Sequence, residues 1–91
     1  MSDQIIVNVS GVDKVGIFAE VTTVLAKNEV NIEDIKQTLM QGHFVMFMLC
    51  DIEKSKYSFK EIKESLMKCG EKMGMEIWVQ KKEIVDNMHK I

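Results

Sequence analysis

The residues best suited to chemistry lie between Val9 and Leu25, where a short apolar run gives way to a helical pattern. Asp13 is a residue type that often caps helices, and it stands just ahead of that pattern. The first N–H groups of a helix lack intrahelical partners and carry about half a positive charge, so they can bind a small anion. Gly16 has no β-carbon and leaves room for a ligand there. A purely structural alternative stays open, in which Asp13 only caps the helix and Gly16 only relieves crowding.

Other catalytic or metal-binding candidates are few. His43 and His89 are far apart in the sequence and belong to no spaced set of metal ligands. Cys50 and Cys69 lie on apolar runs without C-x-x-C spacing, which predicts small buried side chains in a reducing compartment. Ser10 has no sequence partner of the kind that activates a nucleophile. We therefore predict no catalysis, no metal and no cofactor.

Length and composition predict one small domain. The chain has 91 residues, a net charge of −2 and no Arg. Because phosphate-rich partners need clustered cations, this composition weighs against nucleic acid and anionic membrane as main partners. The N-terminus does not resemble a signal peptide, and no apolar run approaches the ~18 residues that a membrane span needs. We expect a single domain over residues 1–91, in the cytoplasm and stabilised by dimerisation.

The first half of the chain reads as strand, helix and strand. Alternating apolar side chains predict a strand over residues 4–10. Apolar residues at three- and four-residue spacing predict a helix from about Lys14 to Lys27. Asn28 tolerates the left-handed conformation that often ends a helix. We interpret residues 31–40 as a second strand.

A hairpin and a second helix follow. Gln41–Gly42 is typical of a hairpin turn, and residues 43–52 are apolar at nearly every position, as in a strand covered on both faces. Ser58 and Glu61 form an S-x-x-E capping box ahead of an apolar helical stripe. Gly74 is well placed to end that helix.

The chain closes with a strand and a tail. Residues 75–80 alternate apolar and polar side chains, with Trp78 on the polar side. The tail, residues 83–91, places four apolar side chains on one side of a short helix: Ile84, Val85, Met88 and Ile91. A helix this short is not stable alone in water, so we expect the tail to dock.

The predicted order is β-α-β-β-α-β plus a tail, an α+β fold. Right-handed crossovers turn this order into a four-stranded antiparallel sheet with two helices on one face, the ferredoxin-like arrangement, with a short C-terminal helix added. The other face would show Ile6, Trp78 and one side of the strand over 44–49. Such an apolar surface favours pairing with a second copy through sheet faces or edges.

Two classes with this element order fit the residues poorly. The run Phe44-Val45-Met46-Phe47 is similar to the end of the third-strand signature of RNA-recognition motifs, but Gly42 stands where a stacking aromatic residue belongs. The first strand offers no aromatic residue, and the charge balance is acidic. An acylphosphatase-like enzyme would hold phosphate with an Arg in the first turn, and this chain has none.

The segments G-V-D-K-V-G-I-F and V-L-A-K-N-E-V-N-I resemble the signature of ACT domains, small regulatory modules that bind amino acids. The resemblance covers nearly the whole chain. The M-H-K-I ending and the Phe-rich third strand are similar to small stand-alone ACT-domain proteins of bacteria and archaea, related to glycine-cleavage-repressor-type domains. The resemblance implies a ligand site at the first turn and the start of the second strand, made of Gly11, Val12, Asp13, Val15, Gly16, Ile17 and Asn31.

Two positions depart from the family pattern. Val15 stands where many ACT domains have Pro, which adds an N–H and loosens the turn. Gly11 stands where some serine-binding members carry a polar side chain. The implied contacts at Val12, Val15 and Ile17 come from backbone groups.

An amino acid also suits these residues on physical grounds. Its carboxylate fits free N–H groups at a helix start, and its ammonium fits a carboxylate or amide oxygen. We expect Asp13 to hold the ammonium and Asn31 to bridge both ends. A site at the seam of a homodimer would let the ligand control pairing. The alternative is a structural or protein-interaction dimer of ACT type with no small ligand, which contacts another protein through Trp78 or the tail.

Overall fold

The computed structural model describes residues 3–88 of the chain. The elements, in chain order, are β1 (Gln4–Val12), α1 (Ile17–Lys27), β2 (Asn31–Met40), β3 (His43–Asp51), α2 (Phe59–Met73), β4 (Glu76–Lys81) and α3 (Lys82–Met88).

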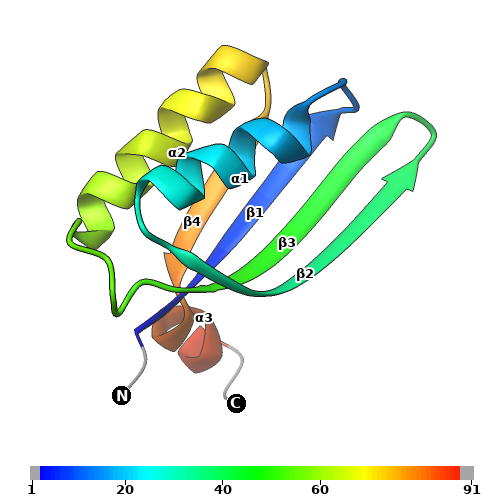
Figure 1. Ribbon diagram of the computed structural model, residues 1–91. Coiled ribbons are helices and arrows are strands. Elements are labelled where there is room, and N and C mark those ends of the chain that lie inside the picture. The colour runs from blue at the N-terminus through cyan, green and yellow to red at the C-terminus, as the bar shows by residue number, and fades with distance from the viewer. Residues whose placement is uncertain (1–2, 89–91) are drawn as a thin grey trace.

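The strands form one sheet in the order β2-β3-β1-β4, and every neighbouring pair is antiparallel. Helices α1 and α2 lie side by side across one face of this sheet (Figure 1). The predicted ferredoxin-like fold and the strand assignment of residues 31–40 are therefore confirmed. β2 and β4 are the two edge strands.

The core lies between the sheet and the two helices. In β1, Ile5, Val7 and Val9 are fully buried, as the alternation of the sequence predicts. They meet the inward side chains of the neighbouring strands and of both helices. These partners include Met46, Met48 and Cys50 of β3, Ile77 and Val79 of β4, Val21 and Leu25 of α1, and Ile62 and Leu66 of α2.

The local signals around the hairpin and α2 act as predicted. Gln41 and Gly42 both have positive φ, 50° and 78°, as a tight hairpin turn of the right twist requires. The Ser58 hydroxyl accepts from the Glu61 N–H at 3.1 Å, and the Ser58 N–H donates to the Glu61 carboxylate at 2.9 Å. Gly74, with φ 68°, ends α2.

Several element ends differ from the prediction. β1 continues to Val12, and α1 begins at Ile17 rather than near Lys14. α1 ends at Lys27 with Asn28 as its C-cap, close to the predicted end, but the left-handed residue is Glu29, with φ 58°. The last strand is shifted by one residue, to Glu76–Lys81.

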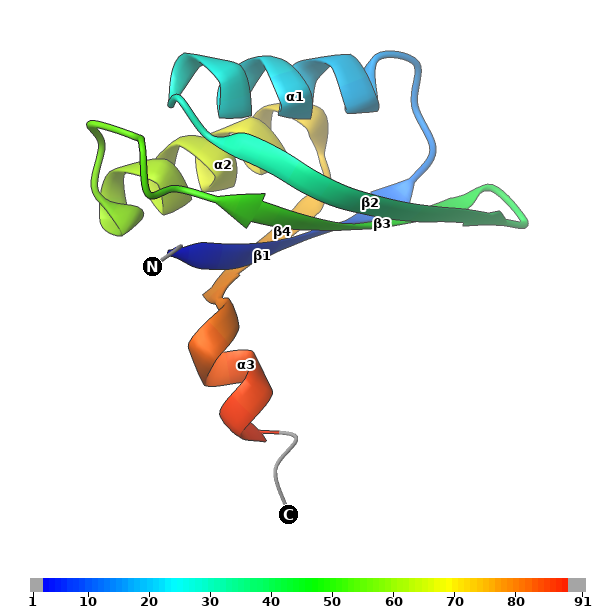
Figure 2. The same cartoon turned by 60° about the horizontal axis from the view of Figure 1, so that its bottom comes forward.

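α3 leaves the sheet on the side opposite α1 and α2, at the end where β1 begins (Figure 2). It contacts β1 and β4, and its Lys82 ammonium binds the Asp86 carboxylate at 2.5 Å. The helix begins one residue before the predicted tail, and residues 89–91, with His89 and Ile91, lie outside the described part of the chain. Within residues 3–88, no helix is long and apolar enough to cross a membrane.

Candidate functional site

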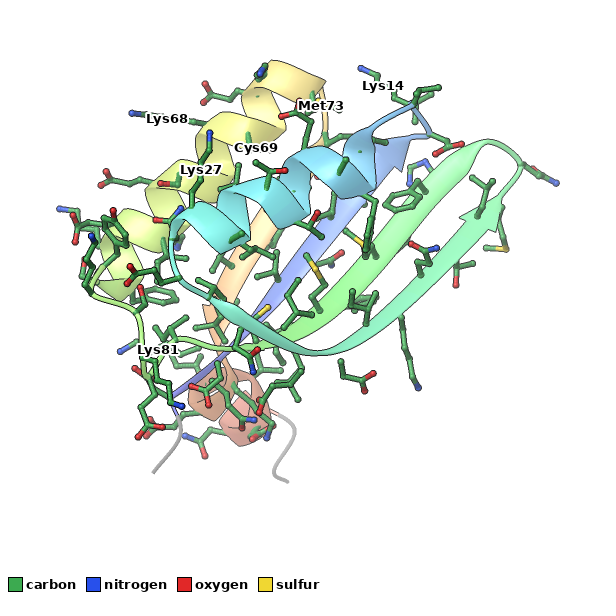
Figure 3. The ribbon with its side chains drawn as sticks, viewed as in Figure 1. Lys14, Lys27, Lys68, Cys69, Met73 and Lys81 are labelled. Carbon is green, nitrogen blue, oxygen red and sulfur yellow. The ribbon has the colours of Figure 1, made fainter. Side chains whose placement is uncertain are left out.

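The turn between β1 and α1 is tied down at both sides by hydrogen bonds. The Asp13 N–H donates to the Gly42 carbonyl at 2.9 Å, which joins the turn to the β2–β3 hairpin. The Lys14 ammonium donates to the Met73 carbonyl at 2.7 Å, at the last turn of α2. Figure 3 shows Lys14 and Met73 at the same end of the molecule. The turn is therefore a fixed feature of the fold.

The start of α1 has no side-chain cap. Its N-cap is Gly16, with φ 87° in the left-handed region, and the prediction of Asp13 as the N-cap is wrong. A capping side chain needs an extended backbone at the N-cap, directly before the helix, as at Ser58 of α2. The left-handed Gly16 delays the helix beyond the reach of Asp13. The Asp13 carboxylate thus remains exposed rather than being used on the helix.

The amides of this helix start face open space. Within residues 3–88, the N–H groups of Phe18 and Ala19 find no hydrogen-bond acceptor. A β-carbon built on Gly16 would meet nothing within 4 Å. A hollow of about 510 Å³ lies beside this start, lined by Asp13, Lys14, Gly16, Ile17, Phe18, Ala19, Gln37 and Phe44. Free donors and a carboxylate on one hollow match the two ends of a small zwitterion.

Gln37 of β2 also lines the hollow, and sequence reasoning missed it. It pairs across the sheet with the buried Met46, so its amide lies on the face that α1 covers. A signal was present, because Ile35, Gln37 and Leu39 alternate on that face and Gln37 is the polar member. Gln37 is exposed, so this signal is weak, and the register of β2 on β3 is what places the side chain at the hollow.

The remaining turn residues contribute in different ways. Ile17 is buried in the core and can offer only its backbone. Val12 and Val15 are exposed, and Val15 points wholly into solvent. Gly11 has φ 151°, and a β-carbon there would lie 2.8 Å from the sulfur of Met75. The Met75 side chain could move aside, so it is the backbone conformation of Gly11 that disfavours a side chain there, which accounts for the missing polar side chain.

Asn31 lies at the opposite end of the sheet from Asp13. Both Asn31 and Gln4 pair with Asp51, whereas Val12 pairs with His43. Eight strand steps separate Gln4 from Val12, which corresponds to about 26 Å. The expectation that Asn31 and Asp13 meet on one ligand is therefore wrong within a single chain.

The two cysteines are poorly suited to reaction. Burial raises the pKa of the Cys50 thiol to about 12, and the Glu33 carboxylate adds to the rise. Burial also raises the pKa of Cys69, again helped by a carboxylate, that of Glu20. Since the thiolate is the reactive form, both stay protonated and inert near neutral pH. No group of three or more acidic, His or Cys side chains in the described chain is arranged to hold a metal ion.

Comparison with known proteins agrees with this architecture. The ACT domain family model matches residues 3–80. A UPF0237 protein from Methanococcus maripaludis is 47% identical over 89 residues, covering 98% of this chain and 99% of the relative. The solved ACT domain protein from Streptococcus pneumoniae is 26% identical, with a TM-score of 0.81 over 100% of this chain and 99% of its own.

A putative glycine cleavage system transcriptional repressor shares the fold. Its TM-score is 0.78 at 18% identity, over 89% of this chain and 46% of the repressor chain. The family match over most of the chain and the close relative together settle membership. The protein belongs to the ACT domain family, whose members are typically regulatory modules that bind small molecules.

Proposed function

We propose that the protein is a single ACT-like domain, residues 1–91, that binds a free amino acid or similar small zwitterion and acts as a regulatory homodimer, not as an enzyme. The observation that carries this proposal is the uncapped start of α1, open to a hollow that also holds a carboxylate. The buried free thiols Cys50 and Cys69 suit a cytoplasmic location, where they stay reduced.

The ligand is oriented by its charges. Its carboxylate accepts from the amides of Phe18 and Ala19, where the helix dipole favours an anion. Its ammonium binds the Asp13 carboxylate, and the Gln37 amide oxygen offers a second acceptor at the hollow. The ligand side chain lies toward Phe18 and Phe44, so a small apolar group suits it better than a charged one.

A second copy brings Asn31 to this site. β2 is an edge strand, and antiparallel pairing of two β2 strands places the start of one beside the end of the other. The second copy's Asn31 then lies at the end of the sheet where Asp13 stands. A ligand held by both chains favours the paired state, which couples binding to assembly.

The alternative is a protein-interaction dimer of the same fold with no small ligand. It is favoured by one observation, the exposure of Phe47 and Trp78 on the sheet face that α1 and α2 leave open. Apolar side chains in such a position are typical of surfaces that bind protein.

Calorimetric titration of the twenty amino acids into the protein tests the proposal. We expect heat for at least one of them and a loss of about tenfold or more in affinity for Asp13→Ala, since a charge-assisted hydrogen bond is removed. Asp3→Ala, a change of the same type at an exposed site away from the hollow, is the control. No heat for any amino acid, or unchanged binding by Asp13→Ala, contradicts the proposal.

Mixing two variants tests the shared site. Asp13→Ala and Asn31→Ala should each bind weakly alone. A mixed dimer of the two has one intact site and one doubly altered site. Because random pairing of an equal mixture makes about half of the dimers mixed, mixing should restore tight binding at about a quarter of all sites. Binding that mixing does not restore would show that Asn31 of the second copy is not part of the site.

A further inference from the structure

The edge strand β4 and helix α2 form a groove at the side of the sheet away from β2. β4 pairs with β1 along one side only, so alternate N–H and C=O groups of Glu76–Lys81 point outward without a strand partner. The hollow along this edge has a volume of about 450 Å³. Figure 1 shows α2 running beside β4 at the margin of the molecule. An extended backbone laid along this edge would find free donors and acceptors.

The middle of the groove is apolar on both sides. Met67 of α2 is 45% exposed, and Trp78 of β4 is 58% exposed. Between them lie Ile77 and Val79, whose side chains point into the core under α2. Because successive side chains of a strand point to opposite faces, a strand added beside β4 would place one set against Met67 and the other against Trp78. The middle of the groove therefore suits a segment that is apolar on both faces.

The end of the groove where β4 finishes carries two cations at one aromatic ring. The ammonium groups of Lys63 and Lys81 lie 6.0 and 5.4 Å from the centre of the Phe59 ring. Within residues 3–88, neither ammonium has a hydrogen bond or an ion pair with a carboxylate. Two like charges held at one ring repel each other, and an anion beside both relieves that repulsion. This end of the groove therefore suits an acidic side chain.

The other end of the groove carries the opposite charge. It is lined by Glu71, near the end of α2, and by Glu76, the first residue of β4. Neither carboxylate has a hydrogen bond or an ion pair in the part of the chain that the structure describes. The groove is thus negative where β4 begins and positive where it ends. A segment that matches it carries a basic side chain at the first end and an acidic one at the second.

We propose that this groove binds an extended segment of another protein, which adds a fifth strand antiparallel to β4. Every strand pair of the sheet is already antiparallel, the more stable kind per residue. Opposite the six residues of β4, the segment has an acidic side chain at position one, beside Lys81, and a basic one at position six, beside Glu76. Positions three and five are apolar and face Met67, and position four is apolar and faces Trp78. This contact uses neither the β1–α1 turn nor the β2 edge, so it goes beyond the proposed function.

The acetylated and amidated peptide Glu-Thr-Val-Ile-Val-Lys has this pattern. Trp78 is the chain's one Trp, so its fluorescence reports on the groove. We expect the peptide to change its emission saturably and to protect it from acrylamide. Gln-Thr-Val-Ile-Val-Gln keeps the apolar middle and should bind about tenfold more weakly, because two ion pairs are lost. No change with the charged peptide, or equal affinity for both peptides, overturns the proposal. Protection that grows with protein concentration alone would assign the groove to a second copy and also overturn it.

Charge reversal on α2 tests the direction of the peptide. Lys63→Glu should weaken binding of the charged peptide by about tenfold, because an attraction becomes a repulsion. Lys68→Glu makes the same charge change on the same helix outside the groove and should leave the affinity nearly unchanged. Circular dichroism checks that both variants fold. Equal affinity of the two variants overturns the proposal. A parallel peptide would bring its Lys to this end, so stronger binding by Lys63→Glu overturns the antiparallel arrangement.

Strand pairing itself is tested on the peptide backbone. Adjacent residues of a strand direct their N–H groups to opposite edges, so only one of positions three and four donates to β4. N-methylation of that position should lower the affinity by about tenfold or more, since a pairing hydrogen bond is lost and the methyl group meets the edge. N-methylation of the other position should have little effect. Equal effects of the two methyl groups overturn strand addition.

Amino acid titration separates this inference from the proposed function. Lys63→Glu should bind any amino acid ligand as the wild type does, because Lys63 does not line the hollow beside α1. Loss of peptide binding with amino acid binding retained supports two independent sites.

Discussion

The two long helices of this protein begin in opposite ways. α2 starts at Ser58, whose capping box with Glu61 satisfies backbone donors at both ends of the box. α1 starts at a left-handed Gly16, and no side chain caps it. Both helices pack on the same sheet face and bury apolar stripes, so core packing does not explain the difference.

The difference shows where the fold leaves polar groups unused. The α1 start is fixed by neighbours instead of a cap: Ile17 is buried, Asp13 bonds the hairpin and Lys14 bonds the end of α2. These contacts hold the turn while its first amides stay free. The α2 start is complete in itself and offers a ligand nothing. An incomplete helix start held in place from outside is the arrangement that suits a binding site.

The largest change in stability is expected from Gly16→Val, which alters the left-handed start of α1. A β-branched residue at φ 87° has a strained backbone. Its β-carbon would meet nothing within 4 Å, so backbone strain, and not a steric clash with neighbours, accounts for the loss of stability. We expect a loss of about 2 kcal/mol in the free energy of unfolding, or roughly 10 °C in Tm. Gly16→Asn, which tolerates this conformation better, should lose less. Equal stability of both variants and the wild type in urea denaturation would show that the turn relaxes freely.

A smaller effect is expected from removing the cap of α2. Ser58→Ala should lower the free energy of unfolding by about 1 kcal/mol, because the Glu61 N–H loses its acceptor. Asp13→Ala should leave stability nearly unchanged, since Asp13 does not cap α1. In amino acid titration the order should reverse. Ser58→Ala should keep the wild-type affinity, whereas Asp13→Ala should lower it. If Asp13→Ala lowered the free energy of unfolding as much as Ser58→Ala does, Asp13 would have to cap α1 after all.

Signals carried by neighbouring residues were readable from the sequence. The capping box at Ser58 and Glu61, the hairpin at Gln41–Gly42 and the helix end at Gly74 each depend on a few adjacent residues. The alternation of β1 likewise fixes which side chains reach the core. Fold class follows from these local signals, because their order admits few topologies.

The site was harder to predict because it depends on contacts between distant segments. Asp13 is a good capping type, and only the backbone of Gly16 shows that it stands too early. Gln37 reaches the hollow through the register of β2 on β3. The family motif implies that Asn31 lies beside Asp13, yet strand direction sends it to the far end of the sheet. A motif gives residue types, and the register decides which of them meet.

The smallest expected effect concerns the link between the two helices. The Lys14 ammonium binds the Met73 carbonyl, at the end of α2 where the helix dipole favours a cation. Lys14→Met keeps the aliphatic stem and removes the donor. Because Lys14 is exposed and screened by solvent, we expect a loss of only about 0.5 kcal/mol, measured by urea denaturation.

Salt identifies the origin of that loss. If the charge of Lys14 acts on the end of α2, the difference between Lys14→Met and the wild type should shrink in high salt. Lys68→Met is the control, since Lys68 lies on the exposed side of α2 and has no hydrogen bond or ion pair within residues 3–88 (Figure 3). A difference that salt leaves unchanged would mean that packing of the Lys14 stem, and not its charge, joins the α1 start to α2. The position of the open helix start would then depend on apolar contact alone.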